Sequence, residues 1–303
     1  MKALNNNPIW HPFTQMKTAA TPIDIVAAKD CTLFTADGKA ILDAISSWWV
    51  TLHGHAQPSI AAAIAAQAQQ LEQVIFAGFT HPPARQLAQT LVELWQGWYD
   101  KVFFSDDGST SVEVALKMAI QYWHNQGITH RKRIIAFNNA YHGDTFGSMS
   151  IAARNAFNAA FSPYLFDVSH IDIPTAENID SVLQQMEALL LQGDTGAFIF
   201  EPLVQGAAGM VMYSPEHLNS LMQLAKKHEV ICIADEVMTG FGRTGKIFAT
   251  QYLPQPADII CLSKGITGGF LPLGVTLCTA KIYAAFHADD KLKTFFHGHS
   301  YTA

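Results

Sequence analysis

Two apolar runs decide the fold of this chain. The first reads VICIAD at residues 230–235, and the second reads DIICLSK at residues 258–264. Each run has the length and the unbroken hydrophobic character of a strand that is buried on both faces of a sheet. The first run ends in the carboxylate of Asp235, and the second ends in the amine of Lys264. For either residue alone, the simpler interpretation is a polar side chain that caps a strand at the surface.

As a pair, the two side chains suit one particular chemistry. A lysine amine forms an imine with an aldehyde, and an aspartate holds a protonated ring nitrogen. Pyridoxal 5'-phosphate (PLP) needs both groups. The choice between capping and catalysis therefore depends on the segments around the two strands.

The rest of the chain alternates short apolar runs with segments of helical length. Apolar runs at residues 101–105, 134–137 and 196–200 are predicted strands, and helical periodicity covers residues 109–123, 179–191 and 215–229. This alternation predicts an α/β fold with a mainly parallel sheet that helices cover on both faces. Unusual polar residues follow each predicted strand directly, so we expect a site beyond the carboxyl ends of the strands.

Composition excludes several classes of function. The net charge of −6 and the absence of basic runs argue against nucleic-acid binding. No apolar stretch reaches the roughly 20 residues of a membrane span, and residues 1–8 lack the apolar core of a signal peptide. Only 15% of the 303 residues are charged, against about 25% in an average soluble protein. Such a surface predicts an oligomer or a chain that lacks covering parts.

Cysteine usage points to a reducing compartment. The four cysteines form no close pair, and three of them lie in strand-like apolar runs, where buried free thiols are expected. A cytoplasmic location fits this pattern. The cysteines are Cys31, Cys232, Cys261 and Cys278.

Residues 107–111, DGSTS, lie between a predicted strand and a predicted helix. Free N–H groups at a helix start, a permissive glycine and hydroxyl side chains make an anion cradle that suits a phosphate. The alternative is an ordinary helix cap at Ser109. The sequence leaves both interpretations open.

A second glycine-rich segment, GFGRTGK at residues 240–246, fits nucleotide-binding patterns in letters but not in context. No strand runs into its first glycine, Ile247 replaces the hydroxyl residue that would bind magnesium, and Pro254 shortens any helix that follows. A loop that bends the chain near the active site is the better interpretation. The His-Gly-His segments at 53–55 and 297–299 lack metal-ligand spacing, so we expect no metal site.

Two aromatic positions are ambiguous. In an extended chain, the adjacent Trp48 and Trp49 would point to opposite faces, as one core and one interface residue. Tyr141 is either a core aromatic or a flat surface that stacks on a ring.

Together, these segments resemble the class III aminotransferases, which are fold-type I PLP enzymes. The segments that carry the resemblance lie at residues 10–16 (WHPFTQM), 46–49 (SSWW), 141–147 (YHGDTFG), 233–245 (IADEVMTGFGRTG), 262–265 (LSKG) and 297–301 (HGHSY). The resemblance runs the whole length of the chain. It implies a mostly parallel seven-stranded sheet with helices on both faces, in a large PLP-binding domain at residues 53–303. Residues 1–52 would form part of the small domain and of the substrate pocket.

The resemblance also implies roles for individual residues. Lys264 would be the catalytic lysine, and Asp235 would pair with the ring nitrogen of the cofactor. The remaining implied cofactor-binding residues are Gly108, Ser109, Tyr141, His299 and Ser300, the last two reaching across from a second subunit of a homodimer. The implied substrate-binding residues are Phe13, Trp48, Tyr141, Arg243, Lys264 and Gly298. Phe13 lies where relatives can carry tyrosine, which bears on donor specificity.

Within the family, the N-terminal markers resemble the subgroup that works in biotin synthesis. This implies a ping-pong transamination of 8-amino-7-oxononanoate to 7,8-diaminononanoate, with S-adenosylmethionine or lysine as the amino donor. Two alternatives stay open: another ω-amino acid aminotransferase, and a chain that binds PLP without turnover. The second follows from the end of the chain at residue 303, where family members continue into a small C-terminal domain with an arginine for the acceptor's carboxylate. We expect that domain to be missing.

Overall fold

A mixed seven-stranded sheet forms the centre of the molecule in the computed structural model, which describes residues 8–301. The expectation about a signal peptide rests largely on residues 1–7, which lie outside the described residues. In spatial order the strands are β4 (Lys101–Ser105), β12 (Gly274–Cys278), β11 (Ile259–Leu262), β10 (Ile231–Asp235), β7 (Thr195–Phe200), β5 (Arg133–Phe137) and β6 (Ser169–Ile171). From β11 to β6 every pairing is parallel, whereas β12 runs antiparallel to both of its neighbours. The predicted mostly parallel sheet is therefore confirmed.

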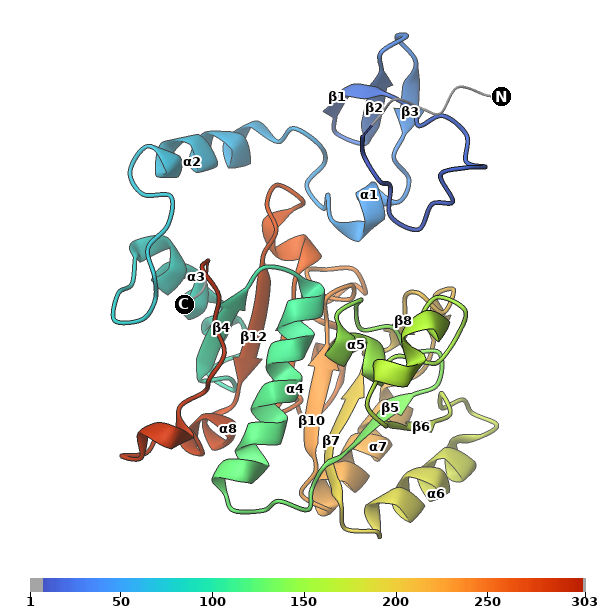
Figure 1. The fold of residues 1–303 in the computed structure, drawn as a ribbon, viewed down its shortest axis with the longest axis vertical. Helices are drawn as coiled ribbons and strands as arrows, with labels where there is room; N and C mark the ends of the chain where they lie inside the picture. The colour runs from blue at the N-terminus through green and yellow to red at the C-terminus, as the bar shows by residue number, and fades with distance from the viewer. Residues whose placement is uncertain (1–7, 302–303) are drawn as a thin grey trace.

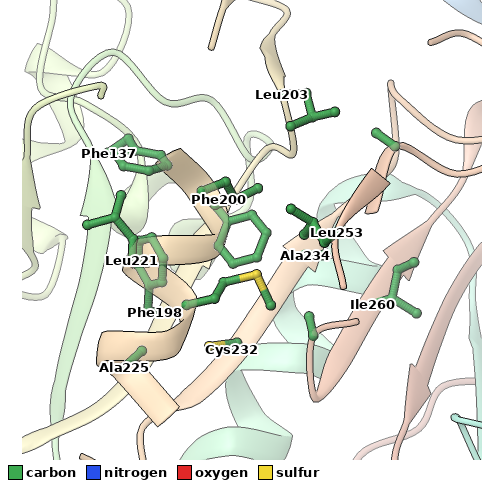
Figure 2. Close-up of a cluster of buried hydrophobic side chains, with 14 of the residues drawn as sticks. Phe137, Phe198, Phe200, Leu203, Leu221, Ala225, Cys232, Ala234, Leu253 and Ile260 are labelled. Carbon is green, nitrogen blue, oxygen red and sulfur yellow. The ribbon is translucent and has the colours of Figure 1, made fainter. Parts of the chain in front are cut away.

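Successive residues of each central strand point to opposite faces of the sheet, and both faces are buried. On β10, Cys232 and Ala234 belong to one core, while Ile231 and Ile233 belong to the other. This alternation explains the continuous apolar runs, because on a strand with two buried faces a polar side chain is costly unless it is hydrogen-bonded. Figure 2 shows part of the first core, where Phe198 and Phe200 of β7 pack near Leu221.

Helices cover both faces, as predicted. α4 (Gly108–Asn125) and α8 (Ala280–Ala284) pack on one face, and α3 (Pro82–Leu94), α6 (Ile179–Leu190) and α7 (Pro215–Lys227) pack on the other. Figure 1 shows α4 crossing the sheet along most of its height. The three helices expected from periodicity are α4, α6 and α7. Within residues 8–301, no helix combines the length and the apolar character that a membrane crossing requires.

The N-terminal part builds a separate small sheet. β1 (Ile25–Lys29), β2 (Thr32–Thr35) and β3 (Ala40–Leu42) pair antiparallel, and Figure 1 shows them beyond one end of the large sheet. The short α1 (Ser46–Trp49) and then α2 (Pro58–Ala68) connect this small sheet to the large domain.

The remaining short elements lie in the connections of the large domain. They are α5 (Phe146–Ile151), the hairpin β8 (Val204–Gln205) and β9 (Val211–Met212), and 3-10 turns at Ala159–Tyr164, Ala249–Tyr252, Lys264–Thr267 and Lys291–Lys293.

Candidate active site

A cavity of about 1130 Å³ opens at the carboxyl ends of the parallel strands. Loops that follow β4, β5, β7, β10 and β11 all contribute to its wall. This is the place that the polar residues after the predicted strands indicated. Of the expected site residues, those that line the cavity are Phe13, Trp48, Gly108, Ser109, Tyr141, Asp235 and Lys264.

Asp235 ends β10 on the side of the sheet that α4 covers, because it continues the alternation of Ile231 and Ile233. Its Oδ2 lies 2.7 Å from Nδ1 of His142, and its Oδ1 accepts the N–H of Val237 at 3.1 Å. Asp235 and His142 are 5% and 3% exposed. A carboxylate only accepts hydrogen bonds, so His142 carries its proton on Nδ1. The acid is thus fixed in orientation before any ligand arrives.

His142 is a site residue whose role the sequence did not reveal. Its other nitrogen, Nε2, is buried and has no hydrogen-bond partner within the described residues 8–301. The signal in the sequence was its position, since it directly follows Tyr141 after a predicted strand. Its bond to Asp235 spans 93 residues of chain, so local pattern could not identify it.

Lys264 begins a 3-10 turn one residue after the end of β11, with a positive φ of 47°. Its Nζ lies 4.8 Å from the ring centroid of Trp49. Burial lowers the pKa of Lys264, although attraction to Asp235 and Glu201 opposes this effect. A larger fraction of this amine is therefore neutral near physiological pH than in an exposed lysine, and the neutral form is the nucleophile.

The start of α4 shows that Ser109 is not the helix cap, and it supports the interpretation of this segment as a phosphate cradle. The helix begins at Gly108 and its cap is Asp107, not Ser109. Asp107 Oδ1 accepts the N–H of Thr110 at 2.7 Å, while Thr110 Oγ1 accepts the N–H of Asp107 at 3.0 Å. Because Asp107 acts as the cap, the N–H groups of Gly108 and Ser109 precede the first intrahelical hydrogen bond. They line the cavity at the positive end of an 18-residue helix.

Two glycines keep this cradle open. A Cβ on Gly108 would lie 2.7 Å from Cγ1 of Val237. A Cβ on Gly143 would lie 2.2 Å from the Ser109 hydroxyl oxygen, and Gly143 has a φ of +126°. The backbone of the Tyr141–Gly143 loop can approach α4 only because residue 143 has no side chain.

Tyr141 is 40% exposed, so it is not a core aromatic. Its hydroxyl donates to Asp144 Oδ2 at 3.0 Å, and its backbone N–H donates to Glu201 Oε1 at 3.1 Å. Burial within the site raises the pKa of the phenol well above its usual range, and the charge of Asp144 adds to this. The ring thus stays neutral and is held at two points on the cavity wall.

Glu201 is a second buried carboxylate at the site, and it is 5% exposed. Besides the N–H of Tyr141, it accepts the N–H of Gly206 at 2.9 Å through Oε2. Burial raises the pKa of Glu201 to about 7, against the attraction of His142, which lowers it. The sequence placed this residue directly after a strand but gave it no role.

The glycine-rich segment at 240–246 forms turns, and only a 3-10 turn follows it, at Ala249–Tyr252. The bending loop is confirmed. Glu236 is fully buried, and it holds this region by accepting hydrogen bonds from Thr239, Ala249 and Thr250. Arg243 is not among the cavity-lining residues; its guanidinium donates to the carbonyls of Met238 at 2.9 Å and Trp49 at 3.2 Å.

The tryptophan pair differs from expectation. Trp48 and Trp49 do not lie in an extended chain, because residues 46–49 have positive φ angles of 50°, 46°, 72° and 68°. Both rings line the cavity. Trp48 packs at 5.9 Å from the ring of Phe13, and neither tryptophan is a core residue.

The C-terminal candidates do not line the cavity of their own chain. His299 Nε2 lies 3.5 Å from Asp106, and the carbonyl of Ser300 accepts a hydrogen bond from Gln73 at 2.8 Å. Gly298 lies in the same segment, away from the cavity wall. A role across a subunit boundary remains a prediction for His299 and Ser300, and a role in the substrate pocket remains a prediction for Gly298. No group of three metal-ligating side chains occurs in the part of the chain that the structure describes.

The residues around the cavity fit PLP in their chemistry. An aldehyde needs a neutral amine, which burial favours at Lys264. A protonated pyridine nitrogen needs an oriented carboxylate, which Asp235 offers. A phosphate needs free N–H groups, which the start of α4 provides. All three groups face one cavity.

Comparison with known proteins gives a consistent result. The family model described as aminotransferase class III matches residues 13–303. The adenosylmethionine-8-amino-7-oxononanoate aminotransferase of Synechococcus elongatus is 51% identical over 303 residues, covering 97% of this chain and 71% of its own length. Its counterpart in Staphylococcus aureus is 37% identical, covering 100% of this chain and 71% of the relative.

Solved structures agree with the sequence comparison. The enzyme of the same name from Methanocaldococcus jannaschii superposes with a TM-score of 0.91 at 38% identity, covering 97% of this chain and 69% of that one. An amine transaminase from an uncultivated Pseudomonas species, solved in its PLP-bound form, gives a TM-score of 0.91 at 32% identity, covering 98% of this chain and 71% of that one.

Proposed function

The chain belongs to the class III aminotransferases, which are PLP-dependent, and we propose that it aminates 8-amino-7-oxononanoate to 7,8-diaminononanoate in biotin synthesis. The observation that carries this proposal is the convergence of Lys264, Asp235 and the start of α4 on one cavity. The substrate follows from the 51% identity to the Synechococcus elongatus relative. We propose S-adenosylmethionine as the amino donor, because that relative's name includes it.

The residues around the cavity would divide the work as follows. Lys264 would hold the cofactor's aldehyde, and Asp235 would pair with the ring nitrogen through a charge-assisted hydrogen bond. The N–H groups of Gly108 and the N–H and hydroxyl of Ser109 would hold the phosphate. Tyr141 would lie against the ring. When bound, PLP supplies an electron sink that lets an amino group leave one substrate and join another.

Lys264 would also carry the proton. Once its Nζ is released by the incoming donor, this amine would take the proton from the substrate carbon and return it as general acid and base. The lowered pKa of Lys264 supports this role, because it makes the neutral amine, which accepts the proton, more available than in an exposed lysine. Donor and acceptor would use the same cavity in turn, which gives ping-pong kinetics.

Aromatic side chains form the substrate wall. Phe13 lies 5.9 Å from Trp48 and 6.3 Å from Phe157, measured between ring centroids. This apolar surface suits the aliphatic chain of the keto acceptor. Phe13 has no hydroxyl to hydrogen-bond a donor, so its contribution there would be apolar contact alone. Arg243 would border the pocket through the carbonyl of Trp49.

We further propose a cytoplasmic homodimer with shared active sites. Three of the four cysteines are buried and free, and large apolar side chains such as Trp10 and Leu42 are exposed on the single chain. His299, Ser300 and Gly298 would reach the neighbouring subunit's cofactor and pocket. Residues 1–52 would form part of a small domain and of the substrate pocket, in line with the small sheet of β1–β3.

The test is an assay with 8-amino-7-oxononanoate as acceptor and S-adenosylmethionine or lysine as donor. Formation of 7,8-diaminononanoate with parallel lines in double-reciprocal plots supports the proposal. Turnover of a simple ω-amine and no product from this acceptor would favour the amine transaminase function of the Pseudomonas neighbour. A cofactor absorbance band that no amine changes would favour a chain that binds PLP without turnover.

A further inference from the structure

Four consecutive residues that are not glycine adopt a left-handed backbone. Ser46, Ser47, Trp48 and Trp49 have φ angles of 50°, 46°, 72° and 68°. Each such residue costs free energy, because its Cβ comes too close to the backbone carbonyl. A run of this kind persists only where the surroundings hold it, and such strain clusters at functional sites. The question is which contacts hold this turn.

Asp43 provides the central contact. Its Oδ2 accepts the Ser47 hydroxyl at 2.7 Å and Nε2–H of His55 at 2.8 Å. The Asp43 side chain is 4% exposed, and its bond to His55 is partly buried, whereas its bond to Ser47 lies at the surface. Hydrogen bonding from the Ser47 backbone, with the Ser47 hydroxyl and His55, lowers the pKa of Asp43 to about 2 against the opposing effect of burial.

The acid is itself tied to the small sheet. The N–H of Asp43 donates to the carbonyl of Cys31 at 2.8 Å. His55 exchanges backbone hydrogen bonds with Asp30, at 2.7 Å and 3.3 Å. At the other end of the turn, Arg243 donates to the carbonyl of Trp49 at 3.2 Å. The strained turn is therefore fastened to the small sheet on one side and to the glycine-rich loop on the other.

The two tryptophans that the turn carries both face the cavity. The Trp49 ring lies 4.8 Å from Lys264 Nζ, and the Trp48 ring lies 5.9 Å from the ring of Phe13. A relaxed turn would move both rings at once. Lys264 would lose an aromatic neighbour that shields its amine from water, and the substrate wall would lose its shape.

We propose that Asp43, with Ser47 and His55, is a positioning clamp that holds the left-handed turn and thereby places Trp49 against Lys264 and Trp48 against the substrate. None of the three clamp residues lines the cavity. The inference rests on the proposed function only for the role of Lys264 and for the substrate wall. The geometry of the clamp is independent of which substrate the enzyme uses.

The test compares Asp43→Ala with Asp37→Asn in the PLP-loaded protein. Asp37 is a matched control, because it lies in the turn of the same small sheet, bonds Thr35 and pairs with Lys39 at 2.7 Å, yet does not touch residues 46–49. In Asp43→Ala we expect hydrogen exchange of residues 44–52 to accelerate at least about tenfold, with exchange in α4 and β10 unchanged. Asp37→Asn should match the parent.

Two further readouts separate positioning from ordinary stability. The pH at which the absorbance of bound cofactor shifts should move in Asp43→Ala, because Lys264 gains hydration. The KM for the acceptor should rise by about tenfold, with a smaller change in kcat. The double variant Asp43→Ala/Ser46→Gly should recover part of both effects, since glycine adopts a positive φ without strain.

If hydrogen exchange of residues 44–52 is unchanged in Asp43→Ala, the proposed clamp is wrong. Faster exchange of the whole protein without any recovery on adding Ser46→Gly would also overturn it, because that pattern indicates a general loss of stability. If Asp43→Ala does not fold, Ser47→Ala and His55→Gln each test one arm, and His55→Gln keeps a donor. Failure of the substrate assay alone leaves the exchange and absorbance results standing, so the two proposals fail separately.

Discussion

His142 Nδ1 and Asp235 Oδ2 lie 2.7 Å apart in the interior, at the carboxyl end of β10. The carboxylate is held on its other oxygen by the N–H of Val237 at 3.1 Å. Asp235 thus faces the cavity in one fixed orientation, with its charge supported by two donors. A preorganised acid of this kind can pair with a cationic ring nitrogen without having to reorganise when the ligand binds.

Replacing His142 tests this support. His142→Ala removes a donor to a buried charge, a loss of about 1.5–3 kcal/mol, so cofactor affinity should fall roughly 10- to 100-fold. His142→Asn, whose amide can replace the Nδ1–H, should lose less. Titration of the purified protein with PLP, followed by absorbance, measures both. Equal affinity in His142→Ala and the parent would contradict the role.

Asp235 itself should matter more for rate than for cofactor retention. Asp235→Asn keeps the shape and a hydrogen-bonding oxygen but removes the charge that would keep the ring nitrogen protonated. We expect some PLP to stay bound, with transamination slowed at least about 100-fold, as when a preorganised electrostatic partner is lost. Single-turnover rates measure this. Asp172→Asn, in a loop where Asp172 bonds Asn138 and Gln185, is the control; unchanged turnover in Asp235→Asn would count against the assignment.

Covalent attachment identifies the catalytic amine. Borohydride reduction of the PLP-loaded protein, followed by peptide mapping, should recover a pyridoxyl label on Lys264. Lys264→Ala should lose the label. Lys246→Ala should keep it, because Lys246 lies in the glycine-rich loop with its amine over the ring of Tyr252. A label that maps to any other lysine of the parent protein refutes the site.

Glu201 predicts a pH dependence of stability. Its folded pKa of about 7 lies above the value of 4.5 expected when it is exposed, so the folded state holds a proton that the unfolded state releases. Stability from this group is present below pH 4.5 and is lost as the pH rises through 7, by up to about 3 kcal/mol. Thermal melts between pH 4.5 and 8 should show this slope, and Glu201→Gln should flatten it. If the melting temperatures of the parent and of Glu201→Gln depend on pH in the same way, Glu201 does not titrate between pH 4.5 and 8.

Gly143 tests the cradle at the start of α4. Gly143→Ala would put a Cβ 2.2 Å from the Ser109 hydroxyl at a φ of +126°, and overpacking of this kind costs about 1–3 kcal/mol. PLP affinity should fall with stability, because Ser109 must move. Gly127→Ala is the matched control, with a positive φ of 75° but open space around the new Cβ. Thermal melts and PLP titration separate the two; similar losses in both variants would mean that backbone strain, not the clash at Ser109, is responsible.

Strand prediction succeeded where a strand buried on both faces is apolar almost throughout, and it failed where such a strand contains a polar residue whose partner is remote. The runs that became β4, β5, β7, β10 and β11 are apolar at nearly every position, and this follows from a strand with cores on both faces. β12 was missed because its short run contains Thr276. The hydroxyl of Thr276 is satisfied only by the carbonyl of Ser111 at 2.7 Å, a partner that exists once α4 has packed on the sheet.

The prediction of an extended chain at the tryptophan pair failed for the same reason. Nothing local in residues 46–49 requires a left-handed turn, and isolated residues of these types avoid it. The hydrogen bonds that hold the turn come in part from His55 and Arg243. Arg243 is 194 positions away from Trp49 in the sequence, so a local sequence pattern cannot reveal the hydrogen bond between them.

The sequence by itself determined the chemistry and its approximate place. Lys264 and Asp235 stand at the ends of buried strands, and the period of two along a strand together with parallel pairing brings such ends to one edge of the sheet. Only the tertiary structure decided how those groups are tuned. His142 and Glu201 act through hydrogen bonds and burial that arise when distant loops meet, and the raised pKa of Glu201 has no local cause in the chain.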